Sequence, residues 1–175
     1  MIAAMMLGEI TGLWRYPVKS MQGEPVDAAV IDETGLPGDR HWALRHRASG
    51  KVMSAKRHPR LLDATARCNG TGVVVTPPSG HVVEGDDPNI SAQLSEWLGI
   101  DVVFEQATDA AQGDYEFQLE GDETAEVLDI PCPDGTFFDF GALHLITTSA
   151  IATMRAADPD LDWDLRRFRP TALVS

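Results

Sequence analysis

The chain has no lysine or arginine between Cys68 and Met154, a span of 87 residues. That span holds 16 of the 27 acidic residues, and the formal net charge of the whole chain is −13. Bulk nucleic-acid binding is excluded on this ground, because it needs a net basic face. The 14 cationic residues fall within residues 15–67 and 155–169, and we expect an anion to be held between these two segments. Alternatively, these cationic residues bind no ligand and are simply the solvated cations of an acidic protein.

Cysteine is also scarce. Cys68 and Cys132 are far apart and have no histidine or cysteine partner at metal-binding spacing, which predicts reduced thiols in a cytoplasmic protein without a zinc site. The apolar run at residues 1–7 lacks a basic flank and is too short to cross a bilayer, so we expect no membrane anchor. With 43% hydrophobic and 23% charged residues, the 175-residue chain suits one folded domain or two small interleaved lobes.

Short apolar alternations and β-branched runs predict a mixed α+β fold that is predominantly β. We expect strands at residues 8–13, 26–32, 41–45, 72–76, 102–104 and 143–146, with at most a short one at 115–119. A helix is predicted between an Asn89 cap and Gly99. A second helix is predicted from the hydroxyl cluster at residues 147–149 to about residue 157.

The middle of the chain predicts a division into two parts. From residue 108 to residue 129 the sequence becomes acidic and loses its apolar period, as expected of an exposed connection. We therefore predict a β-rich N-terminal domain at residues 1–107, an acidic connection at 108–130 and a second domain at 131–175.

Three short motifs contain the cations that are candidates for ligand binding. They are Tyr-Pro-Val-Lys-Ser at residues 16–20, Gly-Asp-Arg-His-Trp at 38–42 and Arg-Arg-Phe-Arg-Pro at 166–170. A lysine beside a hydroxyl, together with arginine forks, supplies the donors that a phosphate group needs. In this order, and together with residues 94–104 and 143–151, the motifs resemble those of MOSC-domain proteins. That group is related to molybdenum cofactor sulfurases and to the amidoxime-reducing components.

The resemblance implies a MOSC N-terminal β-barrel domain followed by a partial MOSC β-barrel. It also implies binding of the molybdenum cofactor, a molybdopterin, with Lys19, Ser20, Arg40 and Arg169 on its phosphate or pterin and with Thr147 and Ser149 assigned more loosely. Molybdenum-ion binding, pyridoxal phosphate binding and catalytic activity are further implications. We expect the first four residues to converge on one cleft.

Each of these residues also has a purely structural interpretation. Lys19 is then a solvated turn lysine, and Asp39 and Arg40 form a surface ion pair. The hydroxyls of Thr147 and Ser149 then serve as a helix cap. In the same way we interpret His144 as a structural histidine rather than a base.

Two features depart from the family pattern. Thr171 stands where the family has asparagine, and the sequence ends at Ser175, upstream of the position of the family's molybdenum-ligating cysteine. Neither Cys68 nor Cys132 stands at that position, so we predict no metal ligand and assign no catalytic residue, and we leave open whether the cofactor is retained.

The end at Ser175 suggests a shortened natural protein, a truncated chain or one half of a split gene. The alternative function is that of a non-catalytic interaction protein, whose open β edge near Leu173 pairs with a second copy. A redox partner protein is a further expectation.

Overall fold

The computed structural model describes residues 8–32, 35–110, 112–117 and 126–175. In chain order its elements are β1 (Ile10–Arg15), β2 (Glu24–Pro25), β3 (Trp42–His46), η1 (Pro59–Asp63), β4 (Thr65–Asn69), β5 (Gly72–Thr76), β6 (Val83–Glu84), α1 (Ile90–Leu98), β7 (Val102–Gln106), β8 (Asp114–Phe117), β9 (Leu128–Pro131), β10 (Leu145–Thr147), α2 (Thr148–Ala157), η2 (Leu165–Arg167) and β11 (Ala172–Val174). The predicted predominantly β fold is confirmed, with two α-helices in the described part of the chain.

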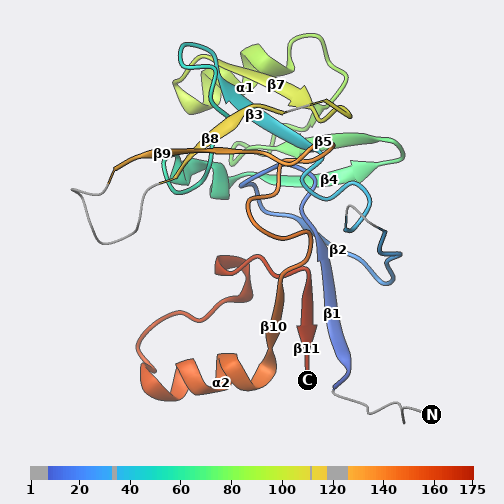
Figure 1. Cartoon of the computed structure of the whole chain (residues 1–175), viewed down its shortest axis with the longest axis vertical. Helices are drawn as coiled ribbons and strands as arrows, with labels where there is room; N and C mark the ends of the chain where they lie inside the picture. The colour runs from blue at the N-terminus through green and yellow to red at the C-terminus, as the bar shows by residue number, and fades with distance from the viewer. Residues whose placement is uncertain (1–7, 33–34, 111, 118–125) are drawn as a thin grey trace.

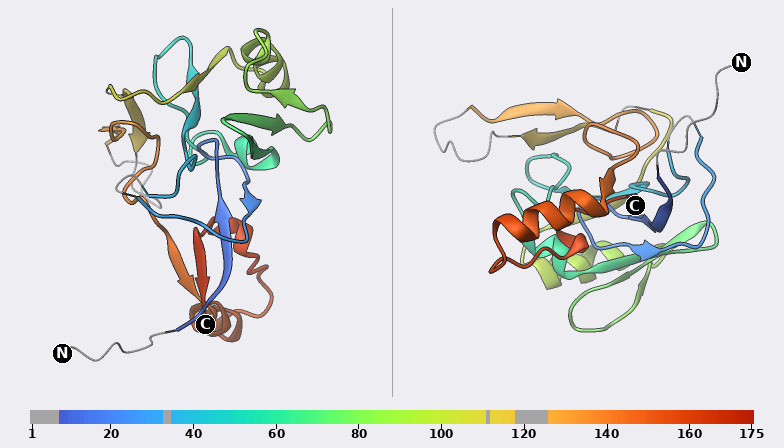
Figure 2. Two further views of the ribbon diagram at one scale, coloured as in Figure 1. Left: turned by 90° about the vertical axis from the view of Figure 1, so that its right-hand side faces the viewer. Right: turned by 90° about the horizontal axis from the view of Figure 1, so that it is seen from below.

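The two ends of the described chain lie in one sheet. β1 pairs antiparallel with β11 and also with β2, and β11 pairs parallel with β10, which gives the strand order β10-β11-β1-β2. Figure 1 shows this sheet with α2 at the opposite end of the molecule from α1, and the left view of Figure 2 agrees. Because β11 follows directly after the last basic segment, its pairing with β1 carries that segment to the Tyr16–Ser20 motif.

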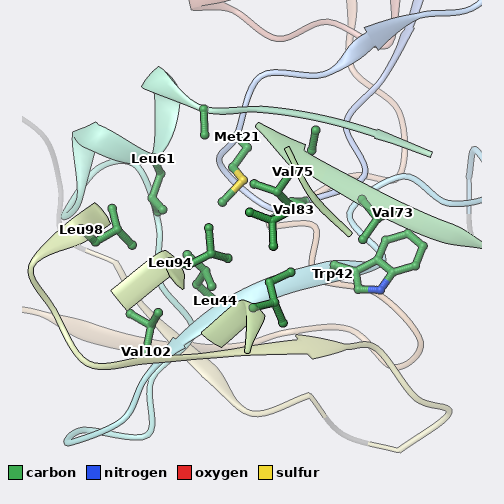
Figure 3. Packing of buried hydrophobic residues seen from close by; sticks show 14 of the residues in the cluster. Met21, Trp42, Leu44, Leu61, Val73, Val75, Val83, Leu94, Leu98 and Val102 are labelled. Atoms are coloured by element: carbon green, nitrogen blue, oxygen red, sulfur yellow. The ribbon is translucent and has the colours of Figure 1, made fainter. Parts of the chain in front are cut away.

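The main hydrophobic core lies under α1. Ile90, Leu94 and Leu98 are spaced four residues apart on one face of this helix and are buried, as the i, i+4 geometry requires. Leu94 lies close to Leu44 of β3 in this core (Figure 3). Full burial of such a side chain stabilises the fold by about 1.5–3 kcal/mol.

The predicted end of α1 is confirmed, whereas its predicted cap is not. Gly99 ends the helix in the left-handed conformation, with a φ of 72°. Asn89 occupies the cap position, but its side chain makes no capping hydrogen bond. The Asp87 carboxylate competes for that end of the helix, since it accepts the Asn89 N–H at 2.8 Å and the Gln93 side-chain N–H at 2.9 Å.

Several strand assignments differ from the prediction, which did not include β2, β4, β6 or β9. The strand predicted at residues 26–32 is wrong. The regular pairing ends before this range, at Glu24–Pro25, and Val30 is 78% exposed. β4 pairs with β5 along its whole length, from Thr65 opposite Thr76 to Asn69 opposite Gly72. Pairing in a hairpin therefore makes β4 a strand, although the mixed composition of β4 does not indicate one.

Acidic residues of the cation-free middle pair with cations of the first basic segment. Arg45 donates to Glu105 at 3.0 Å, Lys51 lies 2.7 Å from Asp129, and Arg47 lies 2.9 Å from Asp101. These pairs are at least partly exposed, so each is worth about 0–1 kcal/mol. They connect strands that are distant in sequence, as the absence of local cations requires.

The division at residues 107 and 130 stays a prediction. The paired strands β8 and β9 lie almost wholly within the predicted connection, and Val52 forms an isolated bridge to Tyr115. Within the described ranges, no helix combines the length and the apolar character needed to cross a bilayer.

Candidate functional site

A cavity of about 250 Å³ lies where the basic motifs meet. Four of the six sequence-predicted binding residues line it: Lys19, Ser20, Arg40 and Arg169. The remaining lining residues are His144 and the segment at residues 137–141. The predicted convergence of these four residues on one cleft is therefore confirmed, and their binding of a ligand stays a prediction.

Three of the cavity residues have strained backbone. Among the described residues other than glycine, positive φ angles occur at Ser20 (68°), Arg40 (48°) and Arg169 (48°). This conformation costs an L-residue about 1–2 kcal/mol, and such strain concentrates at functional sites. All three positions in this chain face the same cavity, so the strain is itself an indication of function.

Hydrogen bonds hold these strained residues in place. The Arg40 N–H donates to the Tyr16 carbonyl at 2.8 Å, and the Arg169 N–H donates to the Leu165 carbonyl at 3.1 Å. The Ser20 hydroxyl accepts the Ala55 N–H at 2.9 Å. Before Arg40, the chain turns at Pro37-Gly38, and Gly38 has a φ of 81° that favours glycine.

Tyr16 organises the two arginines. The Arg169 and Arg40 guanidinium groups lie over its ring, 4.7 and 4.9 Å from the centroid, and the Tyr16 hydroxyl donates to the Pro170 carbonyl at 3.1 Å. Burial raises the pKa of Tyr16 to about 12, although both arginines act to lower it. The ring face attracts two cations that otherwise repel each other.

Lys19 is buried at the other side of the cavity rather than solvated in a turn. Its Nζ donates to the Phe137 carbonyl at 2.7 Å, pairs with the Asp139 carboxylate, and lies 4.5 Å from the centroid of the Tyr115 ring. Burial lowers the pKa of Lys19, and Asp139 opposes that change. With 4% of the side chain exposed, this ammonium group depends on partners inside the protein.

Arg169 differs from Arg40 in how its charge is satisfied. Arg40 pairs with Asp39, which is 8% exposed and also accepts the Tyr16 N–H at 2.6 Å. In contrast, the Arg169 Nε and Nη2 atoms are buried and have no hydrogen-bond partner among the described residues. Burial, and then the nearby Arg40, lower the pKa of Arg169 to about 10. Arg169, which lines the cavity, therefore carries two charged donors without a described partner.

Thr147 and Ser149 are not among the residues that line the cavity. Thr147 caps α2, since its hydroxyl accepts the Ala150 N–H at 3.1 Å, and it also lies 3.0 Å from the Ser149 hydroxyl. The helix-cap interpretation is confirmed for Thr147. A contact of either residue with a cofactor stays a prediction.

Thr171, at which the sequence analysis expected a departure from the MOSC pattern, has a structural contact. Its buried hydroxyl accepts the His144 N–H at 3.1 Å, and the His144 carbonyl accepts the Thr171 N–H at 2.7 Å. These reciprocal bonds hold His144 at the cavity wall.

The sequence interpretation missed Asp139 and His144, which line the cavity, and Tyr16, whose ring lies under both arginines. A signal was present for Asp139, because it is the one acidic residue in the Phe-Phe-Asp-Phe run at residues 137–140. Tyr16 stands at the start of a basic motif. His144 had no comparable signal, since its position follows from the bonds to Thr171.

The fold and the cavity now define the class of protein. The family described as the MOSC N-terminal beta barrel domain matches residues 7–126, more than half of the chain. The chain belongs to this family.

Individual relatives are similar over shorter segments. Mitochondrial amidoxime-reducing component 1 from Homo sapiens is 35% identical over 68 residues, which cover 37% of this chain and 20% of that protein. Molybdenum cofactor sulfurase from Neurospora crassa is 43% identical over 49 residues, 26% of this chain and 5% of that protein. Mitochondrial amidoxime reducing component 2 from Homo sapiens is 38% identical over 60 residues, which cover 32% of this chain and 18% of that protein. The matches thus span a fifth or less of each relative.

Proposed function

We propose that this protein binds the molybdenum cofactor and that the cavity between Lys19, Arg40 and Arg169 holds its phosphate group. The observation that carries the proposal is the pair of buried Arg169 donors, Nε and Nη2, without a partner in the described structure. A buried charged group left in this state costs several kcal/mol. A phosphate accepts two parallel N–H bonds from one guanidinium group, so it suits these donors.

The charges of the cavity also suit a phosphate. Lys19, Arg40 and Arg169 bring three positive charges, while Asp39 and Asp139 bring two negative ones. The name of one relative, molybdenum cofactor sulfurase, points to the cofactor that carries the phosphate. When bound, that cofactor supplies redox chemistry at its metal, and the residues of this chain bind and orient its phosphate end.

The cysteines support a narrower role than catalysis. Cys68 and Cys132 are free, and burial raises the pKa of both thiols, to about 11 for Cys68. A thiolate is the form that ligates molybdenum, so we propose binding of the cofactor without cysteine ligation by these two residues. A cytoplasmic location, where thiols stay reduced, belongs to the same proposal.

The test is cofactor retention by the purified protein. After expression in a host that makes the cofactor, molybdenum is measured by elemental analysis and pterin by fluorescence. We expect Arg169→Gln to reduce pterin retention by at least about tenfold, as the loss of charged hydrogen bonds worth about 1.5–3 kcal/mol requires. Arg67→Gln makes the same charge change at an exposed position of β4 and is the matched control.

Two outcomes contradict the proposal. In the first, Arg169→Gln retains as much pterin as the wild type. In the second, the purified wild-type protein carries no pterin and also binds none when free cofactor is added. Pyridoxal phosphate, titrated in parallel, shows whether the cavity accepts a different cofactor through the same phosphate group.

The open edge expected near Leu173 is wrong, because β11 is paired on both sides, with β1 and with β10. A second candidate function is therefore self-association through β10. This strand ends the order β10-β11-β1-β2, and Leu145 within it is 60% exposed. An exposed edge strand pairs readily with another chain. Light scattering after size-exclusion chromatography should then give a dimer for the wild type and a monomer for Leu145→Lys. A monomeric wild type at high concentration contradicts this function.

A further inference from the structure

The two carboxylates that pair with cations of the cavity are held in different ways. Asp39 is buried, accepts a backbone N–H and pairs with Arg40. The Asp139 side chain is 44% exposed, and its partner in the described structure is the Lys19 ammonium group. Asp39 is therefore part of the folded framework, whereas Asp139 reaches the buried lysine from the solvent side.

We infer that Asp139 occupies the place of a ligand's anionic group and that a phosphate must displace it from Lys19. This inference rests on the proposed function. A carboxylate and a phosphate oxygen are equivalent acceptors for an ammonium group. The Phe137 carbonyl keeps one Lys19 hydrogen at 2.7 Å, and the hydrogen that Asp139 accepts becomes available when the carboxylate leaves.

The exchange also determines which anions the cavity selects. With Asp139 in place, three cations face two carboxylates, so the cavity has a net charge of +1. With Asp139 displaced, the net charge is +2, which a dianionic phosphate monoester neutralises. A monoanion such as acetate leaves a charge of +1 in the opened cavity without a counter-charge, so the opened cavity favours dianions. Asp139 is thus an internal competitor that every anion must displace from Lys19.

The segment that carries Asp139 allows this exchange at small cost. Phe137 is fully buried and anchors the segment, whereas Phe140 is 77% exposed and contacts the edge of Phe117 at 5.9 Å between ring centroids. If only Asp139 and Phe140 move, the Phe137 carbonyl stays hydrogen-bonded to the Lys19 ammonium group. The apolar burial of the segment is preserved, because its main contribution comes from Phe137.

Calorimetric titration with inorganic phosphate and with acetate tests the inference. We expect Asp139→Asn to bind phosphate about tenfold more tightly than the wild type, because the internal competitor is removed. We expect acetate affinity to rise by a similar factor, because acetate must displace the same carboxylate. Asp134→Asn removes the same charge from an exposed residue that does not line the cavity, and its affinity should stay within about twofold of wild type. Asp139→Glu should keep wild-type affinity.

The outcomes separate this inference from the proposed function. If the wild type binds phosphate and Asp139→Asn binds no more tightly, the role of Asp139 is overturned and the phosphate site stands. If the wild type, Asp139→Asn and Asp139→Ser all fail to bind, both are overturned. An equal gain in Asp134→Asn also overturns the role of Asp139, because net charge then explains the effect. Circular dichroism confirms the fold of each variant.

Discussion

The guanidinium group of Arg169 lies 4.7 Å from the centre of the Tyr16 ring, although these residues come from opposite ends of the chain. Arg40 lies over the same ring at 4.9 Å. The antiparallel pairing of β1 with β11 brings the two ends together. An anion site of this kind exists only in the folded protein, since no single segment contains its donors.

Tyr16 variants should separate the ring from the hydroxyl. Tyr16→Phe keeps the ring under both arginines and removes the hydrogen bond to the Pro170 carbonyl, so we expect the free energy of unfolding to fall by about 1 kcal/mol with phosphate affinity within about twofold of wild type. Tyr16→Leu removes the ring face and should weaken phosphate binding by about tenfold. Chemical denaturation and calorimetry measure the two effects. Unchanged phosphate affinity in Tyr16→Leu would show that the ring does not position the arginines.

Alkaline titration provides a spectroscopic check. The chain has two tyrosines, and burial raises the pKa of both Tyr16 and Tyr115 from 10.0 to about 12. We expect phenolate absorbance to appear near pH 12 in the native protein and near pH 10 in denaturant. Since the folded-state pKa is the higher one, stability is fully present below pH 10 and is lost as the pH rises toward 12. Native phenolate formation near pH 10 would contradict the burial of both hydroxyl groups.

The sequence predicted those parts of the fold that depend on local pattern. Leu94 and Leu98 at helical spacing, followed by Gly99, were sufficient to place α1 and its end. The alternation at residues 26–32 was misleading, because a strand also needs a partner and Val30 is left exposed there. β4 shows the converse case, since its order comes from pairing with β5.

The candidate site was predicted in part for the same reason. Lys19, Ser20, Arg40 and Arg169 lie in recognisable motifs, and the structure brings them together. Asp139 enters the cavity because the buried Phe137 anchors its segment beside Lys19, and a contact at that sequence separation leaves no local pattern. Thr147 was assigned through the resemblance, and the structure places its hydroxyl in a helix cap.

The core should respond strongly to truncation. Leu94 is fully buried, and Leu94→Ala should lower the free energy of unfolding by about 2–5 kcal/mol through lost transfer energy and a residual cavity. Leu145→Ala, at a residue that is 60% exposed, should change it by less than about 0.5 kcal/mol. Urea denaturation measures both variants. A small effect at Leu94 would place the stabilising core elsewhere.

Moderate salt should stabilise the protein. The net charge of −13 produces self-repulsion, and the Debye length falls from about 30 Å at 0.01 M salt to about 8 Å at 0.15 M. We expect the thermal midpoint to rise over this range. A falling midpoint would mean that ion pairs such as Arg45–Glu105 outweigh the repulsion.

The most direct measurement of the central claim is the NMR signal of the Arg169 Nε–H during titration with inorganic phosphate. The signal is assigned by its absence in Arg169→Gln. Because this buried donor has no described partner, we expect its resonance to shift downfield and to saturate together with the calorimetric binding curve. An Arg169 Nε–H signal that stays unchanged while phosphate binds would contradict the claim, because the phosphate would then bind outside this cavity.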